Sequence, residues 1–323
     1  MAPSRFNKDR DLRGETFPLG ENLSAEERAL ALSACLGATA KAVEAELDRL
    51  LPRVAGPRGR VVEAMRYAVL GGGKRLRPFL LIQTAALFAV PPRRALRAAA
   101  AYEMLHCYSL VHDDLPAMDD SDLRRGRPAV HKAFDEATAI LAGDGLLTEA
   151  FAVLCHADVH PDAAVRGQLI AGLAQAAGAA GMVGGQMIDL SPNRAQLGLA
   201  GVSELQALKT GALIVDCCRA GARLGQPQAA EIDAVVGYAE DLGLAFQVVD
   251  DLLDYEGDAA QLGKPAGRDP AQGKATFVGL LGPDAARQRA ADLVESACAR
   301  LDLFGQKADV LTATANFVLQ RRS

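Results

Sequence analysis

The sequence predicts an all-α protein, and three observations point to this fold class. Apolar residues recur at helical spacing through most of the 323 residues. Runs that alternate β-branched and polar residues, as strands do, are missing. Glycine and proline clusters separate the helical stretches, but no Ser-, Gly- or Pro-rich run has the length of an interdomain linker. We therefore expect one helical domain over residues 23–323, preceded by a flexible extension of residues 1–22.

The first helix is expected to begin after Ser24, because Ser24 and Glu27 have the spacing of a capping box. An Ala- and Leu-rich run continues this helix to about Leu51. Clusters of glycine and proline then separate the next elements, and Pro78 suits the first turn of a helix. Further helices in this half of the chain are expected over residues 61–70, 79–90 and 94–113.

A second capping-box spacing, from Ser203 to Gln206, predicts another helix start. Within the helix that follows, Lys209 and Thr210 interrupt the apolar pattern next to Gly211, which predicts a local kink. The helices of this half are expected over residues 136–159, 162–183, 203–224, 229–255, 284–303 and 308–321.

Composition excludes several classes of protein. Half of the residues are apolar, so the chain is not disordered, and a net charge of −5 without tryptophan argues against nucleic-acid binding. The six cysteines form no C-x-x-C pair and no secretory signal opens the chain, which predicts reduced thiols in the cytoplasm. Residues 167–188 carry no charge, but their six glycines and three glutamines favour one buried, closely packed helix over a membrane span.

Two clusters of aspartate stand in otherwise apolar helical stretches. In the second, Asp250 and Asp254 are four residues apart, so both carboxylates lie on one helix face and repel each other. Mg²⁺ would offset that repulsion, because it takes oxygen ligands and bridges carboxylates to substrate phosphates. A solvated acidic face would explain one such cluster. Two clusters accompanied by paired arginines and lysines favour a metal site.

The first cluster has a different geometry. Asp113 and Asp119 are six residues apart, which places them on nearly opposite faces of a regular helix. Pro116 also disfavours a continuous helix between them. We therefore expect the helix to break after Asp114 and the chain to loop back, which brings Asp119 to the same metal.

The basic residues fit an anionic substrate. Lys74, Arg75 and Arg77 stand where a glycine turn meets a helix start, and backbone N–H groups and the helix dipole attract anions there. Arg124 and Arg125 can each bind phosphate oxygens with two hydrogen bonds. The glycine turn is not a Walker A loop, because Lys74 is followed by arginine and not by serine or threonine.

Two rival metal sites fail on spacing. Glu103 and His106 form half of a di-iron carboxylate site, but no other histidine has an acidic residue three positions before it. His156 and His160 have the interval of zinc-binding histidines. Ala157 follows His156, however, so the catalytic glutamate of H-E-x-x-H is missing.

Together, the two aspartate-rich motifs and the element Gly72-Gly73-Lys74-Arg75-Leu76-Arg77 resemble the trans-isoprenyl diphosphate synthases, the bacterial farnesyl diphosphate synthases in particular. The similarity runs from about Arg58 to the C-terminus. It is densest at residues 71–78, 106–128, 143–145, 184–190, 209–211, 246–254 and 262–277.

The resemblance implies an isoprenoid-synthase helical bundle around a deep central cavity, usually as a homodimer, and it implies roles for individual residues. Mg²⁺, with three ions per active site, is implied to bind Asp113, Asp114, Asp119, Asp250, Asp251 and Asp254. The isopentenyl diphosphate (homoallylic) site is implied to comprise Lys74, Arg77, His106 and Arg125. The allylic diphosphate site is implied to comprise Arg124, Lys209, Thr210, Gln247 and Lys264, with a less defined part for Lys274. The residues implied to act in catalysis are Asp113, Asp119, Asp250, Lys209 and Thr210.

The expected reaction condenses isopentenyl diphosphate with dimethylallyl or geranyl diphosphate to give C15 farnesyl diphosphate. Tyr108 and Ser109, five and four residues before Asp113, are expected to limit the chain length. A C20 geranylgeranyl diphosphate synthase is the alternative. A class I terpene cyclase would share the aspartates but would not need the basic cluster at residues 74–77, and a non-catalytic homologue would be expected to lose aspartates.

Overall fold

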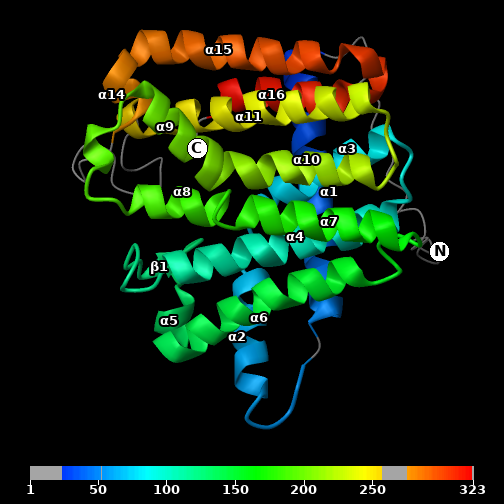
Figure 1. Ribbon diagram of the computed structural model, residues 1–323, viewed down its shortest axis with the longest axis vertical. Coiled ribbons are helices and arrows are strands. Elements are labelled where there is room, and N and C mark those ends of the chain that lie inside the picture. The colour runs from blue at the N-terminus through cyan, green and yellow to red at the C-terminus, as the bar shows by residue number, and fades with distance from the viewer. Residues whose placement is uncertain (1–23, 52, 257–274, 322–323) are drawn as a thin grey trace, which may run out of the picture.

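The computed structural model describes residues 24–51, 53–256 and 275–321, and within these ranges it is almost entirely helical. Most of the long helices run roughly parallel across the molecule and stack in layers, with α15 (Pro283–Arg300) at the top of Figure 1 and α6 (Glu136–Cys155) near the bottom. Helix α1 (Ala25–Leu50) crosses behind them. The predicted all-α class is confirmed. The expected extension of residues 1–22 lies outside the described residues.

The first four helices confirm the expected order. The N–H of Ser24 donates to Glu27 Oε2 at 2.7 Å and the N–H of Glu27 donates to Ser24 Oγ at 3.2 Å, so the capping box forms. Pro78 lies in the first turn of the third helix. The helices are α1 (Ala25–Leu50), α2 (Gly59–Val69), α3 (Leu76–Leu87) and α4 (Pro92–Asp113).

A short hairpin follows α4 and was not expected from the sequence. Strands β1 (Leu123–Arg124) and β2 (Arg127–Pro128) pair antiparallel, and each is too short to show an alternating pattern. The chain then forms α5 (Val130–Ala133) and α6 (Glu136–Cys155). The side chain of Asp135 caps α6 by accepting the N–H of Thr138 at 2.7 Å.

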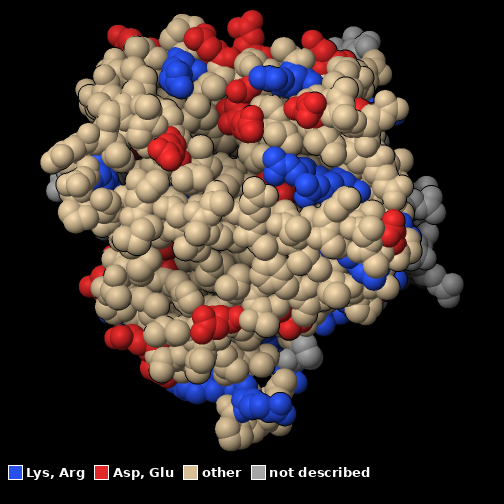
Figure 2. All heavy atoms as spheres, viewed as in Figure 1, with Lys and Arg blue, Asp and Glu red and all other residues tan. Residues whose placement is uncertain are grey.

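The predicted single helix over residues 162–183 is wrong, and so is the prediction of one buried helix across residues 167–188. The structure has two helices, α7 (Ala163–Ala177) and α8 (Met182–Asp189). Gly178 leaves the helical conformation, and a Cβ on Gly181 would lie 2.1 Å from the carbonyl oxygen of Ala176. The chain therefore turns tightly between the two helices. On the face seen in Figure 2, the surface over α8 is largely uncharged.

The predicted helix start at Ser203 is also wrong. After a 3₁₀ turn η1 (Arg194–Gln196), helix α9 (Leu199–Gln206) begins behind Gly198, so Ser203 lies inside it. The expected interruption near Gly211 is confirmed, because α9 passes through a π-helical segment η2 (Ala207–Gly211) into α10 (Ala212–Arg223). A π segment inserts an extra residue into a helix, which is a common feature of functional sites.

The C-terminal part completes the layers. Helix α15 packs along α11, and the short helix α14, which the sequence did not predict, contacts both. The elements are α11 (Ala229–Glu256), α14 (Phe277–Leu281), α15 (Pro283–Arg300), η3 (Asp302–Ala308) and α16 (Asp309–Gln320).

Two large apolar cores lie on opposite sides of α10. Cys217 packs in the core built on α4 and α6, whereas Cys218 packs in the core built on α11 and α15. Both thiols are completely buried, which confirms that this adjacent pair serves two faces of one helix. All six cysteines are free.

One described helix, α6, is long and apolar enough to cross a membrane by its length and composition. Its most apolar window is 44% buried within the protein. The core helix of a soluble protein passes the same test, so this helix is weak evidence for a membrane span.

Close approach of α10 to α3 depends on Gly221. A Cβ there would lie 2.4 Å from the carbonyl oxygen of Leu81. We expect Gly221→Ala to lower the free energy of unfolding by about 1–3 kcal/mol, because the backbones must separate. The control is Gly37→Ala on α1, where nothing lies within 4 Å of the added Cβ. That change should stabilise the protein by roughly 0.5–1 kcal/mol through helix propensity. Urea denaturation measures both, and equal effects would contradict the packing argument.

Candidate active site

The end of α4 confirms the predicted loop of the first acidic motif. The helix ends at Asp113, with Asp114 as its C-cap, and the chain turns back on itself. The N–H of Asp119 donates to the carbonyl of Asp113 at 2.8 Å, and the N–H of Ser121 donates to that of Asp114 at 3.1 Å. These bonds bring Asp113 and Asp119 together although they are six residues apart.

Asp113 is half-buried among polar neighbours from other helices. Gln186 on α8 donates its side-chain N–H to Asp113 Oδ1 at 2.8 Å. Burial raises the pKa of Asp113 to about 6, the positive charge of Lys209 opposes this shift, and the charge of Asp119 adds to it. The side-chain oxygen of Gln186 is buried without a partner in the described part of the chain. A polar ligand at Asp113 would therefore find an unused acceptor beside it.

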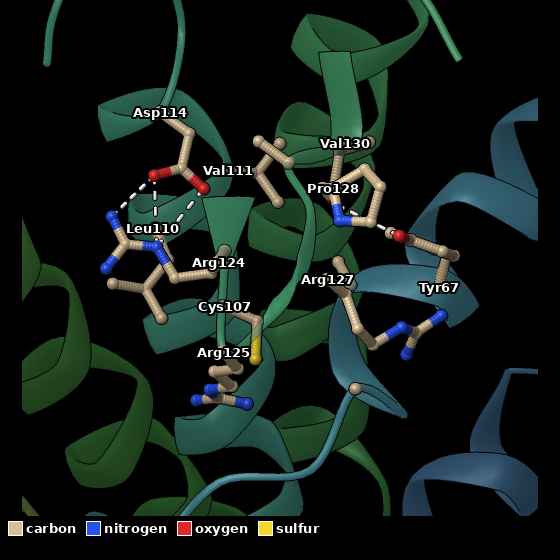
Figure 3. A pocket seen from close by; sticks show the side chains of 13 residues that line it. Tyr67, Cys107, Leu110, Val111, Asp114, Arg124, Arg125, Arg127, Pro128 and Val130 are labelled. Carbon is tan, nitrogen blue, oxygen red and sulfur yellow. Dashed lines mark hydrogen bonds and ion pairs between the residues drawn. The ribbon is translucent and has the colours of Figure 1, made fainter. Parts of the chain in front are cut away.

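Asp114 is held by Arg124 on β1. Its carboxylate accepts the Nε–H of Arg124 at 3.0 and 3.2 Å, and an Nη–H of the same guanidinium. The Asp114 side chain is almost fully buried. Figure 3 shows this fork at the edge of a pocket lined by α2, α4 and the β1–β2 hairpin.

The next residue, Arg125, points elsewhere because the backbone adopts the left-handed region there, with φ +53°. Its guanidinium donates to the carbonyl of Gly72, and its Nη2 lies 3.6 Å from Glu103 Oε1. Gly73 has φ +120°, and a Cβ on it would lie 2.6 Å from the Arg125 guanidinium carbon. The glycine turn thus packs against the Arg125 guanidinium. The neighbouring Arg124 and Arg125 therefore bind different groups, Asp114 in one case and Gly72 with Glu103 in the other.

The basic residues that follow the glycine turn, at positions 74, 75 and 77, differ in how deeply they are buried. Lys74 is exposed in the loop before α3, whereas Arg75 turns inward, is almost fully buried and pairs with Glu103. Arg77 Nη1 lies 3.4 Å from Nε2 of His106 on α4. Burial and the charge of Arg77 hold the pKa of His106 well below its usual value, so this imidazole is neutral at pH 7. The expectation that Arg75 faces an anionic substrate is wrong, because Glu103 matches its charge inside the protein.

The second acidic motif lies at the C-terminal end of α11, at the same end of the bundle as the end of α4 (Figure 1). Asp250 forms an ion pair with Arg321 at 2.7 Å, and Asp254 is half-buried one turn further along the helix. Asp251 is buried on another face and accepts the N–H of Phe277, the first residue of α14, at 2.7 Å. Asp251 therefore holds α14 against α11.

The π segment η2 carries Lys209 and Thr210, both half-buried. Lys209 Nζ pairs with Asp189 on α8 at 2.6 Å, and Arg194 reaches the same carboxylate at 2.9 Å. Helix α8 packs closely on η2, because a Cβ on Gly185 would lie 2.2 Å from the Lys209 backbone nitrogen.

Sequence reasoning assigned no role to three polar residues that support the site, namely Glu103, Gln186 and Asp189. The sequence feature that could have identified them is a charged or amide side chain within an otherwise apolar helical stretch. Gln247 is half-buried on α11, three residues before Asp250. The candidates Lys264 and Lys274 lie outside the described residues.

The described acidic residues suit a metal ion that also takes oxygen ligands from a bound phosphate. Within the described ranges, no group of three or more His, Cys, Asp or Glu side chains is close enough to form a metal site. Mg²⁺ usually keeps several waters and is held by one or two carboxylates together with substrate phosphates. The oxygen donors of Asp113 and Asp119, with the unused oxygen of Gln186, fit such an ion.

Comparison with known proteins decides the family. The sequence profile of the polyprenyl synthetase family matches residues 59–310. The chain belongs to the polyprenyl synthetase family. It is 44% identical to a farnesyl diphosphate synthase of Escherichia coli (strain K12) over 296 residues, 88% of this chain and 97% of that protein.

Other polyprenyl synthetases span a range of products. A solved structure of a FPP/GFPP synthase from Zymomonas mobilis is 45% identical, with a TM-score of 0.82 over 90% of this chain and 99% of the other. Geranylgeranyl pyrophosphate synthase 4 of Arabidopsis thaliana is 39% identical over 286 residues, 87% of this chain and 76% of that protein.

Two residues of this polyprenyl synthetase precede the first acidic motif on α4. Tyr108 is buried, and its ring meets that of His112 edge to face, with 5.6 Å between ring centroids. His112 in turn lies 3.1 Å from the carbonyl of Ile140 on α6. The hydroxyl of Ser109 donates to the carbonyl of His106 at 2.9 Å. The Tyr108 ring therefore packs on His112, and His112 in turn contacts α6.

Proposed function

We propose that this polyprenyl synthetase condenses isopentenyl diphosphate with dimethylallyl and then geranyl diphosphate, and that it releases farnesyl diphosphate. The observation that carries the proposal is the arrangement at the end of α4. Asp113 and Asp119 meet in one loop beside Lys209, while His106, two turns earlier, faces Arg77. One short stretch of helix thus serves both an acidic and a basic subsite. The identity to farnesyl diphosphate synthases supports the C15 product.

The basic subsite is proposed to bind isopentenyl diphosphate. Arg77 and Arg125 supply guanidinium groups, Lys74 adds an exposed ammonium, and the neutral His106 can exchange a hydrogen bond with a phosphate oxygen. Charge-assisted bonds of this kind are roughly twice as strong as neutral ones. This subsite also distinguishes the proposal from a terpene cyclase, which has no second diphosphate to hold.

The acidic subsite is proposed to hold the allylic diphosphate through Mg²⁺, with three ions per active site. Bound Mg²⁺ neutralises the diphosphate and makes it a better leaving group. Asp113, Asp119, Asp250 and Asp254 are the proposed ligands. Asp114 and Asp251 belong to the same motifs, and in this structure they hold Arg124 and α14. The protein groups proposed to contact the allylic diphosphate directly are Arg124, Lys209, Thr210, Gln247 and Lys264.

The proposed reaction needs no side-chain nucleophile. The allylic C–O bond breaks, the diphosphate leaves with the electron pair, and the isopentenyl double bond attacks the allylic C1 from its C4. A proton then leaves C2, and the departing diphosphate accepts it. Lys209 and Thr210 stand on the π segment η2, and we propose that a backbone carbonyl of this segment faces the carbocation. In this proposal, apolar side chains around the bound substrates keep water from the cation.

Product length is proposed to be set by Tyr108, with Ser109 beside it. At about 1.5 Å rise per residue, Tyr108 lies roughly 7 Å below Asp113 along α4. A buried ring at that depth would stop a growing chain at C15. The similarity to a geranylgeranyl pyrophosphate synthase keeps a C20 product as the second candidate. A non-catalytic role is disfavoured because both acidic motifs are complete.

We further propose a cytoplasmic homodimer. Helix α6 exposes Ile140 and Leu141, with 44% and 57% of their surface open to solvent, and a second copy would cover such apolar side chains. The free state of all six cysteines fits a reducing compartment.

Asp113→Asn and Asp250→Asn are expected to lower kcat at least about a hundredfold, because electrostatic stabilisation of the leaving group is the largest catalytic contribution. Asp113→Asn should be the harsher change. Steady-state assays with Mg²⁺ measure the effect, and circular dichroism checks the fold. Asp233→Asn, an exposed position on the same helix as Asp250, serves as the control. Near-normal turnover in both active-site variants would defeat the metal assignment.

Arg77→Ala should raise the KM for isopentenyl diphosphate far more than the KM for geranyl diphosphate. Loss of one charge-assisted contact costs about 1.5–3 kcal/mol, which is roughly 10- to 100-fold in affinity. Arg124→Ala is the matched comparison and should show the opposite preference. Initial-rate kinetics with each substrate varied in turn decides the matter, and equal effects on both substrates would mean that the subsites are misassigned.

Tyr108→Ser should convert a C15 enzyme into one that releases C20 or longer products, because the floor below Asp113 opens. Chromatography of the dephosphorylated products measures chain length. Tyr255→Ser, at an exposed tyrosine of α11, should leave the C15 product unchanged. A Tyr108→Ser enzyme that remains active and still stops at C15 would show that another residue sets the length.

A further inference from the structure

Glu103 on α4 is a buried carboxylate that the proposed mechanism does not use. Only 1% of its side chain is exposed, and it lies outside both acidic motifs. We propose that Glu103 is a positioning residue for the isopentenyl diphosphate subsite, where it holds Arg125 and the glycine turn in the conformation that receives the diphosphate. This inference rests on the proposed function, because it assigns Arg125 to that subsite.

The first contact of Glu103 ties three helices together. Its Oε1 accepts an Nη1–H of Arg75, and the Arg75 side chain is itself only 1% exposed. Arg75 also donates to the carbonyl of Val69, the last residue of α2. Arg75 adopts the left-handed backbone region, with φ +49°, just before α3 begins. The carboxylate on α4 thus fixes the end of α2, the glycine turn and the start of α3.

The second contact reaches the subsite itself. The same oxygen of Glu103 lies 3.6 Å from Arg125 Nη2, and it also accepts the thiol of Cys107 at 3.7 Å. Arg125 donates to the carbonyl of Gly72, inside the turn that Arg75 anchors. Glu103 therefore acts on Arg125 in two ways, by direct attraction and by holding the turn on which its guanidinium rests.

Charge explains why a carboxylate is needed at this position. Three guanidinium groups, those of Arg75, Arg77 and Arg125, come together around α4. Among the described residues, Glu103 forms ion pairs with Arg75 and with Arg125. Without the negative charge of Glu103, these neighbouring guanidinium groups would repel one another. With Glu103, two positive charges remain for an incoming diphosphate, and the cations stay in place before it binds.

The test compares three variants by initial-rate kinetics and urea denaturation. Glu103→Gln should raise the KM for isopentenyl diphosphate roughly 10- to 100-fold and leave the KM for geranyl diphosphate within about twofold. Glu103→Asp, which keeps the charge, should recover part of that loss. The control is Asp216→Asn on α10, a completely buried carboxylate that accepts the hydroxyl of Tyr102 at 2.6 Å. It should lose stability without a change in the KM for isopentenyl diphosphate.

Glu103→Gln leaves the buried Arg75 unpaired, so this variant is accompanied by a double variant that also carries Arg75→Met. Removing both partners of a buried pair restores much of the stability that removing one partner loses. We expect the double variant to regain stability while its KM for isopentenyl diphosphate stays raised. Recovery of that KM together with stability would overturn the proposal and leave Glu103 a purely structural role.

The outcome is separable from that of the proposed function. If the wild type fails to form farnesyl diphosphate, or if Arg77→Ala does not affect the KM for isopentenyl diphosphate, the proposed function or its subsite is wrong. If both of those hold and neither Glu103→Gln nor the double variant changes that KM, only the role of Glu103 is wrong.

Discussion

The arrangement of the site depends on how α4 ends. The N–H of Asp119 bonds to the carbonyl of Asp113, so the chain folds back within one turn and does not continue as a helix. This reversal places two carboxylates at the mouth of one loop and sends the chain directly into the β1–β2 hairpin. Without the reversal, Asp113 and Asp119 would face nearly opposite directions, and the arginines of the hairpin would not reach back to α4.

The β1–β2 hairpin directs its two neighbouring arginines, Arg124 and Arg125, to different subsites. Because Arg125, in the turn of the hairpin, takes the left-handed backbone region, its side chain leaves the hairpin in a different direction from that of Arg124. Arg124 meets Asp114 on the acidic side, whereas Arg125 meets Gly72 and Glu103 on the basic side. Two adjacent residues thereby link the subsites that the proposed reaction brings together. Arg124 is held by Asp114, the C-cap of α4, and Arg125 by Glu103 within that helix.

Support for the acidic side comes from α8, the helix that sequence reasoning placed wrongly. Its Gln186 contacts Asp113 and its Asp189 contacts Lys209, so one short helix holds groups from α4 and from the π segment. The tight turn before α8 and the glycine at its contact with η2 make that position possible. A single helix across residues 167–188, as the sequence predicted, would have carried Gln186 away from Asp113.

The sequence by itself determined the helical class, most helix positions, the break after Asp114 and the interruption at Lys209, since each depends on spacing or on proline and glycine within a few residues. It also indicated the family, because the two aspartate motifs and the basic element are local patterns. Only the tertiary structure decided which charges are matched. Gln186 and Asp113 are 73 positions apart, and Arg75 and Glu103 are 28 apart, so no local pattern connects them. The direction of Arg75 shows the reason most clearly: its sequence neighbours suggest a ligand contact, but the packing of α4 against α3 places a buried carboxylate within its reach.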